Sequence, residues 1–257
     1  MPTLTLDGGG LFYFESRAPR SRRPPLLLLH GAGGRYAHWP PHLRRLPDTT
    51  VYAPDLPGHG NSQGAPRPSI AAYAADVLAL VDALGLERAV VGGHSMGGAI
   101  ALTLALDHPD RLAGLLLVAS GGRLRVSPDI LGGLQTNFEA TVDLIVERAF
   151  GPHAPPDLIR LGRRQLLKCP PAVIHADYAA CDAFDVLPRL SEIHTPTLVL
   201  VGTADQMTPG KYARHLAENI PGAQLALVEG AGHMVALEAP QKVAALVDDW
   251  LQTLEER

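Results

Sequence analysis

Short apolar runs alternate with longer amphipathic stretches along most of the chain. The runs are three to five residues long and end at glycine or a polar residue. This pattern is typical of strands buried on both faces of a parallel sheet. We predict eight strands, the first two separated by a hairpin signal, Asp-Gly-Gly-Gly, at 7–10. The strands are expected at 4–6, 11–14, 25–29, 51–53, 89–91, 115–118, 198–201 and 225–228.

Helical periodicity fills most of the stretches between these runs. Apolar residues between 70 and 84 recur on one helix face, directly after Ser69, a preferred N-cap residue. Residues 97–106 are apolar almost throughout, which predicts a buried helix, and 243–254 carry one apolar face. Strands alternating with helices predict an α/β fold, a mostly parallel central sheet flanked by helices.

The stretch 122–184 interrupts this alternation because it contains no convincing strand. It has a helix start at Ser127 and helix breaks at 155–156 and 170–171, where prolines are paired. We interpret it as three or four helices that form a cap (lid) over the carboxyl edge of the sheet, where open α/β folds bind ligands. An ordinary helical excursion packed on the sheet is the alternative. The expected division is therefore a core of 1–121 and 185–257 and a cap of 122–184.

Composition and charge narrow the function classes. The chain has 257 residues, 46% of them hydrophobic and 19% charged, which is typical of a globular protein. The net charge is −4 and the sequence has no long run of basic residues, so we expect no nucleic-acid partner. We find no signal-peptide pattern and no apolar run near the roughly 20 residues that span a membrane. We expect a soluble, cytoplasmic protein without a membrane partner.

The two cysteines, Cys169 and Cys181, are too few for a disulfide framework or a typical zinc site. Reduced and buried thiols are our preferred interpretation, and a bond between the two is the alternative.

The segment 93–97, Gly-His-Ser-Met-Gly, matches the pattern G-x-S-x-G. It follows an expected strand and precedes an expected helix, which is the context of a nucleophile elbow. A side chain at either glycine would collide with neighbouring backbone, and Ser95 would be strained with its hydroxyl at the sheet edge. The side chain of His94 is expected to point away from that of Ser95. A glycine-rich turn with an incidental serine is the alternative.

A serine hydroxyl needs a base to become a nucleophile. His233 lies in a glycine-rich loop after the last expected strand, and an imidazole can take and return a proton near neutrality. Asp205 follows the strand expected at 198–201 and would orient that imidazole. The order Ser95, Asp205, His233 is typical of one hydrolase architecture. Weaker acidic candidates are Asp55, which we expect to organise its own loop, Asp182 and Asp185.

Catalysis by serine also needs donors for a developing oxyanion. We predict the backbone N–H of Met96, directly after Ser95, and the N–H of Ala32. Ala32 lies in the glycine-rich segment 30–34, whose glycines would allow close approach to a substrate. The segment does not continue to Gly-Lys-Ser/Thr, as a phosphate loop would. His30 is expected to brace this loop.

Taken together, these motifs resemble the α/β-hydrolase superfamily, in particular its small capped serine hydrolases of the carboxylesterase-like branch. The resemblance covers nearly the whole chain and rests on five motifs in the family's order: 30–31, 55–62, 93–98, 202–205 and 232–233. It implies the α/β-hydrolase fold with an inserted helical cap. Ser95 stands where haloalkane dehalogenases and epoxide hydrolases of the family carry aspartate, which argues against both activities.

The predicted function is a carboxylesterase that cleaves small to medium esters through an acyl-enzyme on Ser95. The substrate would be a small ester-like molecule, and neither a metal nor an organic cofactor is required. Four apolar residues of the expected cap are candidates for the acyl pocket or equally for core packing: Phe138, Leu144, Ile145 and Phe150. The oligomeric state is left open.

Other functions of the family use the same triad. A hydrolase of carbon–carbon bonds in ring-fission products, or an enol-lactonase, is the main alternative, and a small-molecule receptor with slow turnover is a remote one. Carbon–carbon hydrolases of the family usually have asparagine where His94 stands, and a guiding arginine in the cap. Candidates for such an arginine are Arg123, Arg125, Arg160, Arg163 and Arg164.

Overall fold

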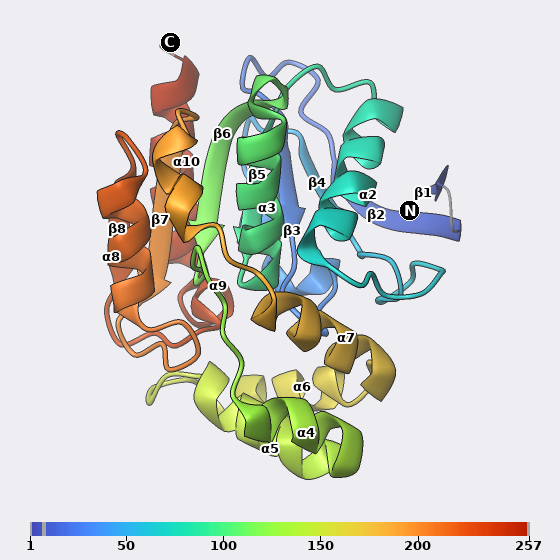
Figure 1. Cartoon of the computed structure of the whole chain (residues 1–257). Helices are drawn as coiled ribbons and strands as arrows, with labels where there is room; N and C mark the ends of the chain where they lie inside the picture. The colour runs from blue at the N-terminus through green and yellow to red at the C-terminus, as the bar shows by residue number, and fades with distance from the viewer. Residues whose placement is uncertain (1, 7–8, 256–257) are drawn as a thin grey trace.

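The eight expected strands form a single sheet in the computed structural model, which describes residues 2–6 and 9–255 (Figure 1). The strand order is β1-β2-β4-β3-β5-β6-β7-β8; β2 pairs antiparallel with both β1 and β4, and every other neighbouring pair is parallel. The strands are β1 (Thr3–Leu6), β2 (Gly9–Ser16), β3 (Leu26–Leu29), β4 (Val51–Pro54), β5 (Ala89–His94), β6 (Leu112–Val118), β7 (Thr197–Gly202) and β8 (Gln224–Val228). The centre of the predicted 7–10 hairpin turn lies outside the described residues.

Helices cover both faces of this sheet, which confirms the predicted α/β class. The core helices are α1 (Pro41–Arg44), α2 (Ile70–Ala83), α3 (Met96–Asp107), α8 (Gly210–Asn219), α9 (Val235–Glu238) and α10 (Pro240–Glu255). Side chains of α2, α3 and α8 pack in the cluster on one face, and those of α1, α9 and α10 pack in the cluster on the other. Ser69 Oγ accepts the N–H of Ala72 at 3.2 Å, so the expected N-cap of α2 is confirmed.

Strand β3 shows why the apolar runs are continuous. All four of its leucines are fully buried. Leu27 and Leu29 join the cluster on one face of the sheet, and Leu26 and Leu28 join the cluster on the other. Successive side chains of a strand point to opposite faces, so a strand covered on both sides needs apolar residues at every position.

Four helices lie between β6 and β7 in the sequence: α4 (Pro128–Thr136), α5 (Phe138–Ala149), α6 (Pro156–Leu166) and α7 (Pro171–Asp182). Figure 1 shows them together at the end of the sheet toward which the parallel strands point. They have an apolar cluster of their own. An isolated bridge pairs Arg123 with Asp185 where the chain leaves and re-enters the sheet region. We call residues 122–184 the helical insertion; its division from the core as a cap stays a prediction.

Short 3-10 helices connect some of these elements: η1 (Tyr36–His38), η2 (Pro109–Arg111) and η3 (Leu187–Glu192). None of the described helices is long and apolar enough to cross a bilayer.

Cys169 and Cys181 are both free, and only Cys181 is buried, so the expectation of a buried thiol fails for the half-buried Cys169.

Candidate active site

Ser95 sits in the sharp turn between β5 and α3. Its φ of 52° and ψ of −115° are strained for a residue with a side chain. The turn is tight enough to require glycine nearby, because a Cβ on Gly93 would lie 2.0 Å from the carbonyl oxygen of Gly97. A Cβ on Gly97 would lie 2.3 Å from the carbonyl oxygen of Leu29. The backbone of Ser95 is held by its N–H, which donates to Val118 O, and by the hydroxyl of Ser120, which donates to Ser95 O.

Asp205 follows β7, His233 follows β8, and the two side chains are in contact. The ring Nδ1 of His233 lies 3.0 Å from Asp205 Oδ2, and both side chains are buried. The hydroxyl of Thr208 donates to the same carboxylate oxygen at 2.8 Å and lies 3.2 Å from His233 Nδ1. Oδ1 of Asp205 accepts the backbone N–H groups of Met207 and Thr208. This arrangement holds Nδ1 as the protonated nitrogen and leaves Nε2 as the basic one.

The carboxylate of Asp205 stays ionised despite its burial. Burial alone would raise the pKa of Asp205. The charge of His233 and the hydrogen bonds from His233 and Thr208 outweigh that effect and lower the pKa to about 2. A charged carboxylate is therefore present beside the imidazole throughout the neutral range.

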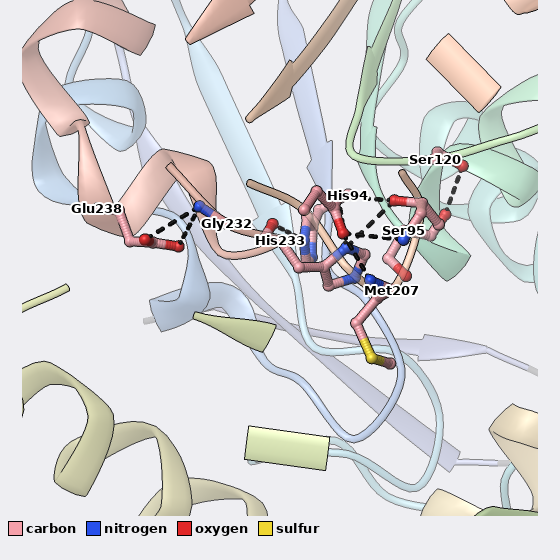
Figure 2. Close-up of polar contacts among 9 residues, drawn as sticks. His94, Ser95, Ser120, Met207, Gly232, His233 and Glu238 are labelled. Carbon is pink, nitrogen blue, oxygen red and sulfur yellow. Dashed lines mark hydrogen bonds and ion pairs between the residues drawn. The ribbon is translucent and has the colours of Figure 1, made fainter. Parts of the chain in front are cut away.

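Ser95 and His233 line the same cavity, but Ser95 Oγ has no hydrogen-bond partner among the residues that the structure describes. Figure 2 shows the two residues gathered with His94, whose ring centroid is 4.7 Å from that of His233. Catalytic hydrogen bonds are often long in structures without substrate and tighten on binding. The structure thus brings His233 and Asp205 into contact and places Ser95 in the wall of the cavity that His233 also lines.

His94 contradicts one expectation, because it lines the cavity together with Ser95 instead of pointing away. Its Nε2 lies 3.0 Å from the carbonyl oxygen of His233, which can only accept, so Nε2 carries the proton. Burial, together with the neighbouring His233, lowers the pKa of His94 to about 3. His94 is therefore neutral at physiological pH and supports the main chain of the His233 loop.

The segment 31–34 runs beside the elbow, since a Cβ on Gly31 would lie 3.2 Å from Ser95 Cβ. His30 is fully buried, donates from Nδ1 to Gly31 O at 2.8 Å and accepts the N–H of Leu56 at Nε2, which confirms its bracing role. Ala32 lines the cavity, whereas Met96 is fully buried directly after Ser95. Within the described part of the chain, the N–H groups of Ala32 and Met96 have no hydrogen-bond partner. Both are free to donate to an anion at the cavity wall.

Asp55 organises its own loop, as expected. It is fully buried, and its carboxylate accepts the N–H of Tyr36 at 2.6 Å and the N–H of Asn61 at 2.8 Å. Asp182 and Asp185 lie at the end of the helical insertion, where Asp182 accepts the N–H of Val126 and Asp185 pairs with Arg123. None of these three acids lines the cavity.

The cavity has a volume of about 230 Å³ and lies between the strand ends and the helical insertion. Of the four candidate apolar residues, Ile145 and Phe150 line it, whereas Phe138 and Leu144 pack against the insertion's own cluster. Of the five arginines considered, only Arg125 lines it. The lining, which belongs entirely to described residues, includes Arg35 and Arg125 and neither Asp nor Glu.

Three residues near the site escaped the sequence analysis. Thr208 follows Asp205 by three residues, a spacing at which an aspartate often bonds its own turn, so this signal was available. Arg35 follows the glycine-rich segment directly and also lines the cavity. Glu238 accepts the N–H groups of Gly232 and Gly151 and reaches the His233 loop from the side away from Ser95 (Figure 2). Gly151 and Gly232 lie far apart in sequence, and no local pattern predicts that Glu238 bonds both of them.

Metal binding finds no support in the described residues. They contain no group of three or more His, Cys, Asp or Glu side chains that could hold an ion. His38 and His42, four residues apart in the sequence, flank two prolines and do not share a helix, because η1 ends at His38 and α1 begins at Pro41.

Comparisons with known proteins identify the family of this chain. The model of the "Alpha/beta hydrolase family" matches residues 26–246. The chain is 32% identical to "Putative carbamate hydrolase RutD" of Caulobacter sp. (strain K31), over 98% of both chains. It is 33% identical to a solved thermophilic esterase, with a TM-score of 0.87 over 98% of this chain and 97% of that one. An enol-lactonase from Burkholderia xenovorans LB400 superposes with a TM-score of 0.90, 27% identity, and coverage of 98% and 100%. The resemblance seen in the sequence is thereby confirmed, and the chain belongs to the alpha/beta hydrolase family.

Proposed function

We propose that this hydrolase is a serine carboxylesterase that cleaves small to medium carboxylic esters through an acyl-enzyme on Ser95. The observation that supports the proposal most strongly is the contact of His233 Nδ1 with the buried Asp205, in a cavity whose wall also contains the strained Ser95. A serine, a base and an orienting carboxylate are the parts that acyl transfer to serine requires. The helical insertion acts as the cap of this site.

The first half of the reaction is acylation. Ser95 Oγ adds to the ester carbonyl while Nε2 of His233 takes the hydroxyl proton. Asp205 holds the ring in the correct tautomer and stabilises the imidazolium that forms. The tetrahedral intermediate collapses, the bond to the alcohol oxygen breaks, and His233 returns the proton to the leaving alcohol. Water then attacks the acyl-enzyme by the same steps and releases the carboxylic acid.

The negative charge of the tetrahedral intermediate is stabilised by backbone donors. The N–H of Met96 lies at the start of α3, where unpaired N–H groups and the helix dipole favour an anion. The N–H of Ala32, in the neighbouring loop after β3, supplies the second hydrogen bond. Such fixed donors are worth about 10²–10³ in kcat each. Neither a metal nor an organic cofactor takes part.

The cavity sets the substrate class. Side chains such as Ile145, Val146, Phe150 and Leu166 make most of its wall apolar, which suits an alkyl acyl chain. Its charged residues are Arg35 and Arg125, without a carboxylate in the lining. Neutral or anionic esters are therefore favoured over esters with a cationic acyl or alcohol group.

A lactonase is the second candidate, and its support is the similarity to the enol-lactonase of Burkholderia xenovorans LB400. A lactone is a cyclic ester, so the same serine, base and oxyanion donors would open its ring. Lactone opening differs from hydrolysis of an open-chain ester in one respect: the alkoxide or enolate released from the carbonyl carbon stays linked to the acyl group through the rest of the former ring.

The test is hydrolysis of 4-nitrophenyl esters from acetate to palmitate, alongside a panel of aliphatic and enol lactones, by wild type and Ser95→Ala. Serine-dependent turnover of the open-chain esters with an optimum in chain length is the expected result. Faster serine-dependent opening of a lactone than of any ester would transfer the assignment to the lactonase. Equal ester turnover by Ser95→Ala would overturn both.

A further inference from the structure

One residue of the helical insertion reaches behind the proposed oxyanion site. Asp177 lies on α7 and is fully buried. Its Oδ2 accepts the N–H of Gly33 at 2.8 Å and Nε2–H of His59 at 2.7 Å, and its Oδ1 accepts the hydroxyl of Tyr73 at 2.7 Å. A single carboxylate of the insertion thus joins three separate segments of the core.

We propose that Asp177 is a positioning residue for the oxyanion loop, so that the helical insertion contributes to the chemistry as well as covering the cavity. The inference rests on the proposed function, in which the N–H of Ala32 binds the oxyanion. Ala32 lies between two fixed points, since His30 holds Gly31 O on one side and Asp177 holds the N–H of Gly33 on the other.

The packing around Gly33 shows that the loop depends on the insertion. Gly33 has a φ of +62°, and a Cβ there would lie 2.7 Å from Leu166 Cδ1 and 3.0 Å from Ile174 Cγ1, both residues of the insertion. The glycine therefore lets the loop approach α6 and α7 closely, and the carboxylate of Asp177 accepts the Gly33 N–H at this contact. Without that carboxylate the buried N–H of Gly33 would lack an acceptor, and the loop would have to shift to satisfy it.

The charge of His59 explains why a carboxylate is needed. Nδ1 of His59 faces Pro57 O at 3.1 Å and Nε2 faces Asp177, and both partners can only accept, so both nitrogens carry protons. Burial would lower the pKa of His59, but the hydrogen bond and the charge of Asp177 outweigh it and raise the pKa. The pair has no net charge, so no lone anion lies behind the site where an oxyanion forms.

Stability alone does not account for such a pair. Taking two charges out of water costs free energy that apolar packing between helix and core would not require, and buried pairs are weak contributors to stability. Oδ2 must accept from two donors at once. An amide oxygen in this place could still accept from both, but it carries no negative charge to balance a protonated His59, and its nitrogen would face the Tyr73 hydroxyl where Oδ1 now accepts.

The test compares three variants: Asp177→Asn, which is isosteric, Asp177→Ala, which removes the acceptor, and Tyr73→Phe. Tyr73→Phe is the matched control because it removes one buried hydrogen bond to the same carboxylate and leaves Oδ2 in place. We measure kcat and KM for 4-nitrophenyl acetate, the affinity for an alkyl trifluoromethyl ketone, which adds to the serine as an oxyanion, and thermal unfolding.

A displaced oxyanion donor should cost about 10–100-fold in kcat. We expect a loss of about tenfold for Asp177→Asn and about 100-fold for Asp177→Ala, with KM changed less than about threefold. Affinity for the ketone should fall in the same proportion as kcat. Tyr73→Phe should keep its kcat within about twofold although its Tm falls. If Asp177→Ala does not fold, Asp177→Asn and Tyr73→Phe carry the comparison.

The inference is overturned if folded Asp177→Asn keeps kcat and ketone affinity within about threefold of wild type, or if Tyr73→Phe loses as much kcat as the Asp177 variants do. Wild type that hydrolyses no ester and binds no ketone would overturn the proposed function, and this inference with it. Active wild type with unaffected variants would overturn the inference alone.

Discussion

The strand ends of the sheet and the helical insertion contribute to the site in different ways. Ser95, Asp205 and His233 each follow a parallel strand, and the turns that hold them are built from neighbouring backbone and glycine. The insertion contributes side chains such as Ile145 and Phe150, from α5 and its C-terminal end, and Asp177, from α7. In the proposed mechanism the strand ends carry the groups that make and break bonds, and the insertion sets the shape of the cavity and the placement of the oxyanion loop.

This difference makes a general point about α/β sites. A group held by its own turn, as Asp205 is by the N–H groups of Met207 and Thr208, depends less on distant segments of the chain. A group such as the N–H of Ala32 depends on a contact between α7 and the loop after β3, 144 residues apart in sequence. Substitutions at strand ends should therefore affect catalysis most, whereas those that line the cavity from the insertion should affect substrate preference, with Asp177 as the exception that acts on kcat.

The largest effect is expected at Asp205. Asp205→Asn would let the ring of His233 adopt the wrong tautomer, and we expect kcat to fall about 10⁴-fold. The measurement is the steady-state rate with 4-nitrophenyl acetate. Asp182→Asn is the matched control from the insertion, because Asp182 also accepts a backbone N–H but lies outside the cavity. Equal losses in both variants would contradict the separation between the two regions.

A smaller but still large effect is expected when alanine replaces a helix glycine at the elbow. The new Cβ of Gly97→Ala would press on the backbone of Leu29, and we expect the free energy of unfolding to fall by about 3 kcal/mol. Gly132 lies in α4 with open space around it, so Gly132→Ala should stabilise the protein by about 0.5–1 kcal/mol. Urea unfolding measures both, and an elbow variant as stable as wild type would argue against the tight turn.

The pH dependence of stability comes next. The pKa of Asp205 is about 2 in the folded protein, against about 3.9 when unfolded. Its carboxylate therefore stabilises the fold above about pH 4, and about 2–3 kcal/mol of that stability is lost as the pH falls to about 2. The stability difference between wild type and Asp205→Asn should shrink over this range in urea unfolding.

The insertion offers a control for this measurement. The hydrogen bond from Arg163 holds the pKa of Asp143 below its usual value, but that pair is exposed and screened by water. Asp143→Asn should leave the acid limb of the stability curve unchanged. A flat curve for wild type and Asp205→Asn alike would show that Asp205 is not held as described.

The smallest effect concerns substrate preference. Ile145→Ala enlarges the cavity, and the ratio of kcat/KM for 4-nitrophenyl hexanoate over acetate should rise about tenfold. Leu144→Ala, one position earlier on α5 but outside the cavity, should leave that ratio unchanged. A similar shift in both variants would mean that loosening of the insertion, and not the shape of the cavity, controls the preference.

The sequence predicts the sheet and the strand-end residues well because their signals are local. A strand buried on both faces must be apolar throughout, and the elbow must have glycine at positions 93 and 97, so both features are visible in a few consecutive letters. The same holds for His30 and Asp55, which bond segments next to strand ends. All eight strands and the role of these two residues follow from such patterns.

The insertion is predicted less completely because its contacts are long-range. Ile145 and Leu144 are equally apolar in sequence, and only the rotation of α5 decides which one faces the cavity. His94 was expected to point away from Ser95, but both residues line the cavity, with the sharp turn at Ser95 directly after His94. Asp177 has no local signal at all, since its three partners come from other parts of the chain.

The measurement that tests the central claim most directly is labelling by a fluorophosphonate, followed by intact-mass analysis and peptide mapping. Wild type should gain one phosphonate group, on Ser95, and lose its esterase activity in step with the labelling. Ser95→Ala should stay unlabelled while its circular dichroism spectrum and Tm match those of wild type. A label on another residue, or continued labelling of folded Ser95→Ala, would contradict the assignment of Ser95 as the nucleophile.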